Sequence, residues 1–156
     1  MKIFDIPGFG RLELEHLVLD YNGTIARDGA VLPEAVERMN ALAEDIALHV
    51  ITADTFGSVR LQLQGLPCQV AVLAPGNQAE AKRDYVRSLG AQRCAAIGNG
   101  RNDRLMLAEA ALGIAILGHE CASVAALTAS DIAASSISEA LELLLNPLRL
   151  IATMRE

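Results

Sequence analysis

Residues 17–24 read LVLDYNGT, in which three consecutive aliphatic residues lead directly into a carboxylate. A short apolar run of this kind is typical of a strand that is buried on both faces, and Gly23 favours a tight turn after it. We therefore predict that Asp20 lies at the carboxyl end of a buried strand. It is either a functional carboxylate or an Asp that caps the turn, and residues 17–24 alone do not separate the two.

The rest of the chain alternates short apolar runs with amphipathic segments. Pro33 is placed to begin a helix, and Val36, Met39 and Leu42 would form its inner face. Further strands are expected at residues 46–51, 70–73, 94–97, 114–116 and 131–133. Residues 141–145 lie on the last clear helix, which Pro147 would interrupt.

Three of the predicted helices carry boundary signals. Asn77 and Glu80 have the spacing of a capping box, and Gly90 is placed to end the helix that they begin. Asp54 or Thr55 would cap the preceding helix. A later helix would start at Asn102 or Asp103 and end near Gly113.

This order of elements predicts an α/β fold, a Rossmann-like three-layer sandwich with a mainly parallel sheet and helices on both faces. The chain has 156 residues, of which 52% are hydrophobic and only 3% aromatic, so one domain, 1–156, with an aliphatic core is expected. Residues 1–15 would add a hairpin that turns at residues 8–10. Residues 25–32 are too few for a large cap domain and would form a small flap.

The formal net charge of -6 argues against nucleic-acid binding, which requires clustered Lys and Arg. The three cysteines form no C-x-x-C pair, so neither a zinc site nor a disulfide framework is indicated. No signal-peptide pattern and no apolar run of membrane-spanning length occur in the sequence, so we expect a cytoplasmic protein without a membrane partner.

Four predicted strand or helix ends carry polar residues that could converge at one edge of the sheet. Besides Asp20, these are Thr52, Lys82 and the segment GNGRND at residues 98–103. Thr52 alone is better explained as a helix cap, and Lys82 alone as a surface side chain. The density of Asn, Asp and Gly at 98–103 favours a ligand-binding loop, because oxygen ligands suit Mg²⁺.

The order and spacing of these four segments resemble the haloacid dehalogenase-like superfamily of phosphohydrolases, over about residues 15–145. Asp20 to Thr24 is similar to the D-x-D-G-T motif, and residues 98–103 are similar to the G-D-G-x-N-D form typical of P-type ATPase domains and their soluble relatives. The resemblance implies an Mg²⁺-dependent phosphatase of a small phosphorylated molecule. It implies a catalytic set of Asp20, Asn22, Thr52 and Lys82, with Asp20 as the nucleophile that forms an aspartyl-phosphate. The implied substrate-binding residues are Gly23, Thr52, Ala53 and Lys82, and the implied metal ligands are Asp20, Asn22, Asn99 and Asp103.

Two residues depart from the family pattern. Asn22 replaces an acid/base Asp and cannot exchange a proton with the leaving group, and Asn99 replaces a metal-binding Asp. The alternative is therefore a catalytically impaired member with a ligand-binding or protein-interaction role. Slow autophosphorylation or phosphotransfer ranks third, because the sequence supplies no ATP-binding domain.

Members without a large cap often cover the site with a neighbouring subunit, so the resemblance also implies a homo-oligomer. Structural roles are expected for His16, His49 and His119, because none is spaced to pair with a nucleophile.

Overall fold

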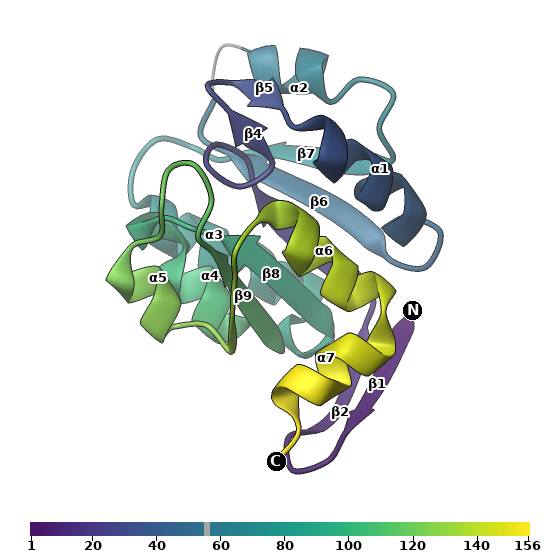
Figure 1. Ribbon diagram of the computed structural model, residues 1–156. Helices are drawn as coiled ribbons and strands as arrows, with labels where there is room; N and C mark the ends of the chain where they lie inside the picture. The colour runs from purple at the N-terminus through teal and green to yellow at the C-terminus, as the bar shows by residue number, and fades with distance from the viewer. Residues whose placement is uncertain (55–56) are drawn as a thin grey trace.

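The protein is described by a computed structural model that covers residues 1–54 and 57–156 (Figure 1). Its centre is a six-stranded sheet in the order β10-β9-β8-β3-β6-β7, in which every neighbouring pair is parallel. The strands are β3 (His16–Asp20), β6 (Ala47–Thr52), β7 (Cys68–Val72), β8 (Cys94–Gly98), β9 (Leu112–Ile116) and β10 (Ile132–Ala134). The predicted α/β fold is confirmed, and β3 occupies an interior position between β8 and β6.

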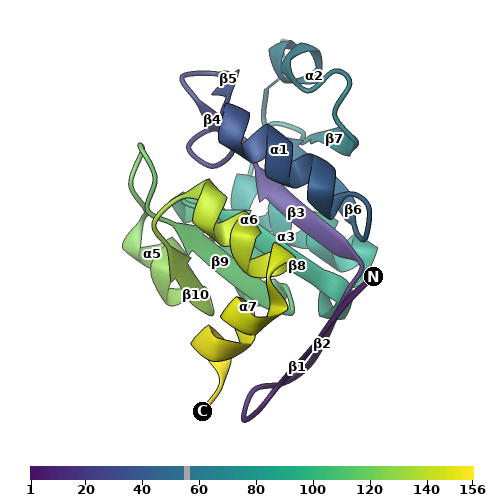
Figure 2. The ribbon, with the colours of Figure 1, turned by 45° about the vertical axis from the view of Figure 1, so that its right-hand side comes forward.

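Helices cover both faces of the sheet, as Figures 1 and 2 show. One face carries α1 (Pro33–Leu42) and α6 (Ile137–Leu145), and the other carries α3 (Gln78–Leu89), α4 (Arg104–Glu109) and α5 (Val124–Thr128). Side chains alternate along β3, so Leu17 and Leu19 join the α1–α6 core while Val18 joins the α3–α4 core. Burial on both faces explains why the strand reads as a continuous apolar run.

The predicted boundaries of α3 are confirmed. The Asn77 side chain accepts a hydrogen bond from the Glu80 backbone N–H, and Gly90 adopts a left-handed φ of 89° after the last turn. The N-cap residue of α2 (Ser58–Gln62) is Gly57 and not the predicted Asp54, although the Asp54 side chain accepts a hydrogen bond from the backbone N–H of Val59 at 3.0 Å. The alternative cap, Thr55, lies outside the described residues.

Two other local predictions are wrong. The inner face of α1 is formed by Ala35, Met39 and Leu42, and Val36 is only half-buried, because positions four and seven residues after Ala35 share its side of the helix. The helix expected to end near Gly113 ends at Glu109, and Gly113 lies inside β9. A Cβ atom at Gly113 would overlap the carbonyl oxygen of Leu107, so glycine is needed where α4 crosses the strand.

Two hairpins flank the sandwich. β1 (Lys2–Ile6) and β2 (Gly10–Leu14) pair antiparallel and pack beside α7 (Pro147–Met154), which Pro147 begins. The short strands β4 (Ala26–Arg27) and β5 (Ala30–Val31) form a small hairpin after the Asp20 loop.

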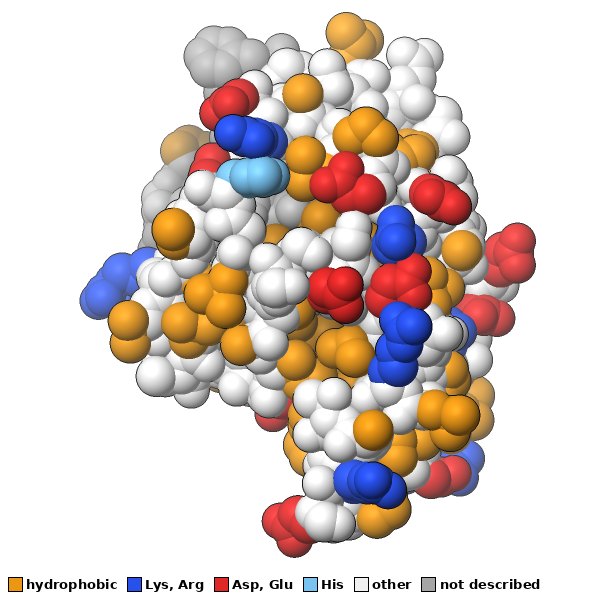
Figure 3. Space-filling model, viewed as in Figure 1, with side chains coloured by type: hydrophobic (Ala, Val, Ile, Leu, Met, Phe, Trp, Pro, Cys, Tyr) orange, Lys and Arg blue, Asp and Glu red, His pale blue; other side chains and the backbone are white. Residues whose placement is uncertain are grey.

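The face that carries α1, α6 and α7 bears interspersed acidic and basic side chains (Figure 3). Arg38 of α1 and Arg149 of α7 both bind the Glu142 carboxylate of α6, at 3.0 and 3.4 Å. These ion pairs link the three helices. In the described ranges, no helix combines the length and apolar character needed to cross a membrane.

Candidate active site

Asp20 is the last residue of β3, and the chain turns sharply after it. The carbonyl oxygen of Tyr21 accepts hydrogen bonds from the backbone N–H groups of Thr24, Ile25 and Ala26, and Gly23 has a φ of 77°. The turn brings the Thr24 hydroxyl back to donate to Oδ2 of Asp20 at 3.1 Å. The Asp20 carboxylate is therefore held at the carboxyl edge of the sheet, and Asp20 as a whole is only 8% exposed.

Lys82 is the partner of this carboxylate. It lies in the second turn of α3, is 2% exposed, and places its Nζ atom 2.6 Å from Oδ1 of Asp20 and 2.6 Å from Oδ1 of Asp103. A lysine this deeply buried is stable only with compensating anions. The structure therefore excludes the surface role that its position in the sequence suggested by default.

Asp103 lies beneath the site, fully buried. Its Oδ2 atom accepts hydrogen bonds from the backbone N–H groups of Asn99 and Gly100, at 2.9 and 2.8 Å. A Cβ atom on Gly98 would lie 2.6 Å from Cγ of Asp103, so glycine is required there. Both oxygens of Asp103 are thus engaged, one by Lys82 and one by the 99–100 backbone.

The buried cluster changes the acidity of its members. Burial raises the pKa of Asp20 to about 6; the Asp103 charge adds to the rise, while Lys82 and the Thr24 hydroxyl oppose it. Burial acts to lower the pKa of Lys82, but the Asp20 and Asp103 carboxylates outweigh it and the pKa is raised. At neutral pH, Asp20 is ionised and Lys82 is protonated.

An open cavity of about 270 Å³ lies above this cluster. Of the residues singled out from the sequence, it brings together Asp20, Asn22, Thr52, Ala53, Lys82 and Asn99. Thr52 ends β6, and its hydroxyl accepts a hydrogen bond from the Asp54 N–H at 3.1 Å. Gly23 and Asp103 are not among the residues that line this cavity: Asp103 supports it from below, and Gly23 faces a second cavity.

Gly100 and Asn102, from the predicted loop at residues 98–103, also line the Asp20 cavity, whereas Gln78 and Glu120 line it and were not anticipated from the sequence. Glu120 follows β9, the fifth strand along the main sheet. The rule that sites form at the carboxyl ends of strands applies equally to β9 and would have drawn attention to this residue. Gln78 lies in the first turn of α3, and no signal in the sequence distinguishes it.

Asn99 is held in one orientation. Its Nδ2 atom donates to the carbonyl oxygen of Cys121 at 2.9 Å, which turns Oδ1 toward the Thr24 hydroxyl, 3.4 Å away. The same hydroxyl contacts Oδ2 of Asp20. Oxygen atoms of Asp20 and Asn99 therefore face a common region of the cavity, and oxygen donors of this type fit Mg²⁺.

Metal binding here would depend on more than carboxylates. Within residues 1–54 and 57–156, no group of three or more His, Cys, Asp and Glu side chains is arranged to hold a metal ion. A cation in this cavity would take part of its ligands from amide or backbone oxygens, with Asp20 and Asn99 contributing side-chain oxygens.

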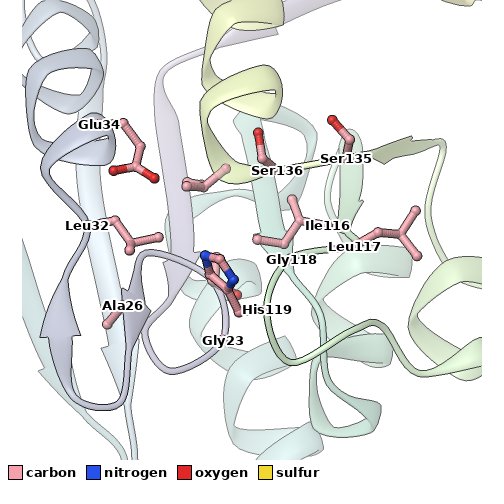
Figure 4. Close-up of a pocket in the computed structure, with 12 residues that line it drawn as sticks. Gly23, Ala26, Leu32, Glu34, Ile116, Leu117, Gly118, His119, Ser135 and Ser136 are labelled. Carbon is pink, nitrogen blue, oxygen red and sulfur yellow. The ribbon is translucent and has the colours of Figure 1, made fainter.

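The second cavity, of about 240 Å³, lies on the other side of the Asp20 loop, where Gly23 lines it (Figure 4). Leu32 and Ile116 form part of its apolar lining, and Glu34, His119 and Ser136 supply polar groups. It lies against the Asp20 loop without including Asp20 or Lys82. Its mixed lining suits a small organic molecule better than a bare phosphate.

No protein-family model matches the chain. An uncharacterised protein from Methanocaldococcus jannaschii is 51% identical over 61 residues, an alignment that spans 39% of this chain and 66% of that protein, slightly less than two thirds of its length. Nothing about activity follows from this relative.

Solved structures are similar over nearly the whole chain. The 3-deoxy-D-manno-octulosonate 8-phosphate phosphatase from Moraxella catarrhalis, in complex with magnesium, phosphate and KDO, has a TM-score of 0.71 at 19% identity, covering 91% of this chain and 94% of that one. A protein from Legionella pneumophila described as a HAD-superfamily (subfamily III A) hydrolase has a TM-score of 0.72 at 17% identity, covering 90% and 87%. Likeness at these identities establishes architecture, and the chain accordingly has the fold of the haloacid dehalogenase-like hydrolases.

Proposed function

We propose that the protein is an Mg²⁺-dependent phosphohydrolase that acts on a small phosphorylated molecule through an aspartyl-phosphate on Asp20. The observation that carries the proposal is the buried contact between Asp20 and Lys82, 2.6 Å long, at the floor of an open cavity at the carboxyl edge of the sheet. A carboxylate and an ammonium group held together beneath a cavity of this size suit an incoming phosphoryl group. The likeness to a phosphatase that binds magnesium and phosphate supports the same reading.

In the first step, the ionised Asp20 carboxylate attacks phosphorus, and the bond between phosphorus and the leaving oxygen breaks. Lys82 and the Thr52 hydroxyl, which both line the cavity, would bind the phosphoryl oxygens. Mg²⁺, held by oxygens of Asp20 and Asn99, would offset the repulsion between carboxylate and phosphate when bound. The raised pKa of Asp20, about 6, still leaves it ionised at neutral pH.

In the second step, water attacks phosphorus and releases phosphate, which restores the Asp20 carboxylate. Asn22 is exposed at the cavity, where a carboxyl group would assist both steps by proton transfer. Its amide cannot do so, and such assistance is typically worth about 10²–10⁴ in rate. We therefore expect slow turnover and a preference for phosphoesters whose leaving groups depart without protonation.

The test is phosphate release from a panel of phosphoesters with Mg²⁺, compared with the matched variant Asp20→Asn. Wild type should release phosphate above the variant, and beryllofluoride with Mg²⁺ should raise the melting temperature of wild type only. The proposal would be rejected if the two proteins released phosphate equally and if beryllofluoride with Mg²⁺ changed their melting temperatures by the same amount.

A second candidate function is a binding protein that retains the fold with little catalysis. The amides of Asn22 and Asn99, at positions where the resembling family carries carboxylates, favour it, and the second cavity offers a place for a small molecule. This reading predicts ligand-dependent stabilisation that persists in Asp20→Asn, without phosphate release by any variant. Turnover by wild type at ordinary phosphatase rates would exclude it.

We also propose that the protein forms a homo-oligomer. No residue of the short flap formed by β4 and β5 lines the open Asp20 cavity, which leaves the cavity for a neighbouring subunit to cover. Light scattering that shows only monomer at micromolar concentration would contradict this.

A further inference from the structure

The carboxylates around the candidate magnesium position are few. Asp103 is fully buried and both its oxygens are engaged, by Lys82 and by the N–H groups of Asn99 and Gly100. Among the residues expected to bind the metal, Asp20 is then the only charged one that lines the cavity, and it shares the charge of Lys82 with Asp103. Because the affinity of oxygen sites for divalent cations rises with the number of charged ligands, this set alone predicts weak binding.

Glu120 brings another carboxylate into the same cavity. It lies in the loop between β9 and α5 and lines the cavity together with Asp20 and Asn99. A Cβ atom on Gly23 would overlap the Glu120 carboxylate and would lie 2.8 Å from Nδ2 of Asn99. The carboxylate therefore rests over Gly23, beside the amide that replaces the usual metal-binding Asp, and glycine at position 23 leaves room for it.

Asn99 also holds the loop that carries Glu120. Its Nδ2 atom donates to the carbonyl oxygen of Cys121, and its own carbonyl oxygen accepts a hydrogen bond from Ser123 N–H at 2.9 Å. Cys121 adopts a left-handed φ of 60°, an uncommon conformation for a residue with a side chain. The hydrogen bonds made by the side chain and by the backbone carbonyl of Asn99 thus fix the backbone immediately after Glu120.

The charge of Glu120 is not neutralised by a neighbouring cation. Within the part of the chain that the structure describes, no Lys, Arg or His forms an ion pair with it, whereas Asp20 and Asp103 share Lys82. Glu120 is exposed, so water solvates its carboxylate, and the negative charge is available to a cation that enters the cavity.

We propose that Glu120 is a metal-positioning residue, whose carboxylate contributes to the magnesium site the negative charge that Asn99 lacks. The inference rests on the proposed function, because it assumes that the cavity binds Mg²⁺ beside Asp20. It assigns a role to the β9–α5 loop, which lies outside the four segments recognised in the sequence.

The experiment measures Mg²⁺ binding directly, by calorimetric titration of the metal-free protein without substrate. Glu120→Gln keeps the shape of the side chain and removes its charge, and it should raise the Kd for Mg²⁺ by about 10-fold or more, within the range seen when groups near a metal are altered. Glu120→Asp, which keeps the charge, should recover part of the affinity. Glu44→Gln is the matched control, since this exposed residue precedes β6 at the opposite edge of the sheet and should leave the Kd unchanged.

The outcomes separate this inference from the proposed function. If wild type binds Mg²⁺, Asp20→Asn loses that binding and Glu120→Gln matches wild type, the role of Glu120 is wrong while the magnesium site stands. If wild type binds no Mg²⁺ at millimolar concentration, both the role of Glu120 and the magnesium dependence of the proposed function are overturned. Circular dichroism of each variant establishes that a weaker affinity does not result from unfolding.

Discussion

The Nζ atom of Lys82 lies 2.6 Å from Oδ1 of Asp20, although the two residues are 62 positions apart and belong to a helix and a strand. The same ammonium group binds Asp103 at 2.6 Å. One buried cation therefore compensates two buried anions. The stability of the fold and the chemistry proposed for the cavity depend on the same three side chains.

Replacement of Lys82 by Met should destabilise the protein by about 3–5 kcal/mol, because it leaves Asp20 and Asp103 buried without their cation. Urea unfolding at neutral pH measures the change. Lys2→Met is the control: Lys2 pairs with Asp45, a carboxylate with half its side chain exposed, and this change should cost about 0–1 kcal/mol. If both variants lost the same free energy of unfolding, the buried cluster would contribute no more to stability than a surface ion pair.

His49 should make stability dependent on pH. It is 2% exposed, and its ring contacts Nδ1 of His16 at 3.1 Å and the Tyr85 hydroxyl at 2.9 Å. Burial first, and repulsion from His16 second, lower the pKa of His49 to about 4. An unfolded chain takes up this proton near pH 6.5, whereas the folded protein takes it up only near pH 4, so the unfolded state binds more protons between these values.

Protonation of His49 should therefore contribute a loss of stability as the pH falls from about 6.5 to about 4, so His49→Gln should lose on the order of 3 kcal/mol less than wild type over this window. Asp20, whose pKa is raised to about 6, contributes in the opposite direction and equally in both proteins. Urea unfolding at several pH values measures both slopes. His119→Gln, at an exposed position, should keep the wild-type slope. A His49→Gln slope indistinguishable from wild type would contradict the assignment.

Asn22→Asp should speed phosphate release by about 10²-fold, because it introduces a proton donor at the cavity. The gain should be larger for alkyl phosphates than for aryl phosphates, whose leaving groups need little protonation. Steady-state kinetics with one substrate of each kind measures the difference. Asn102→Asp adds the same charge to the same cavity from another position and should bring no comparable gain. If both variants accelerate hydrolysis equally, charge rather than proton transfer limits the rate.

Asn99→Asp should have opposite effects with and without metal. Without metal it loses the donor to the Cys121 carbonyl and places a carboxylate oxygen against it, at a cost of about 1–3 kcal/mol. With Mg²⁺ the added charge should increase metal-dependent stabilisation. Melting temperatures in chelator and in Mg²⁺ measure the two effects. The interpretation fails if the melting temperature of Asn99→Asp in chelator equals that of wild type. Asn102→Asp serves as the control variant.

Short-range sequence features predicted the positions of many strands and helices. The apolar run before Asp20 predicted β3, and the cap at Asn77 with Gly90 predicted the bounds of α3. These features depend on neighbouring residues, so they can be read without knowledge of the tertiary fold. Val36 was misplaced because helical periodicity leaves the edge of the inner face ambiguous, and only contact with the sheet selects Ala35.

The sequence by itself determined that Asp20 ends a buried strand, that strands and helices alternate, and that Asn22 and Asn99 are neutral where the resembling family carries carboxylates. Only the tertiary structure decided that β3 lies between β8 and β6, that Lys82 points inward to two carboxylates, and that Glu120 enters the cavity. The physical reason is the range of the interactions. Caps and periodicity act within a few residues, whereas strand order, burial of charge and the reach of a loop depend on segments brought together by the packed core.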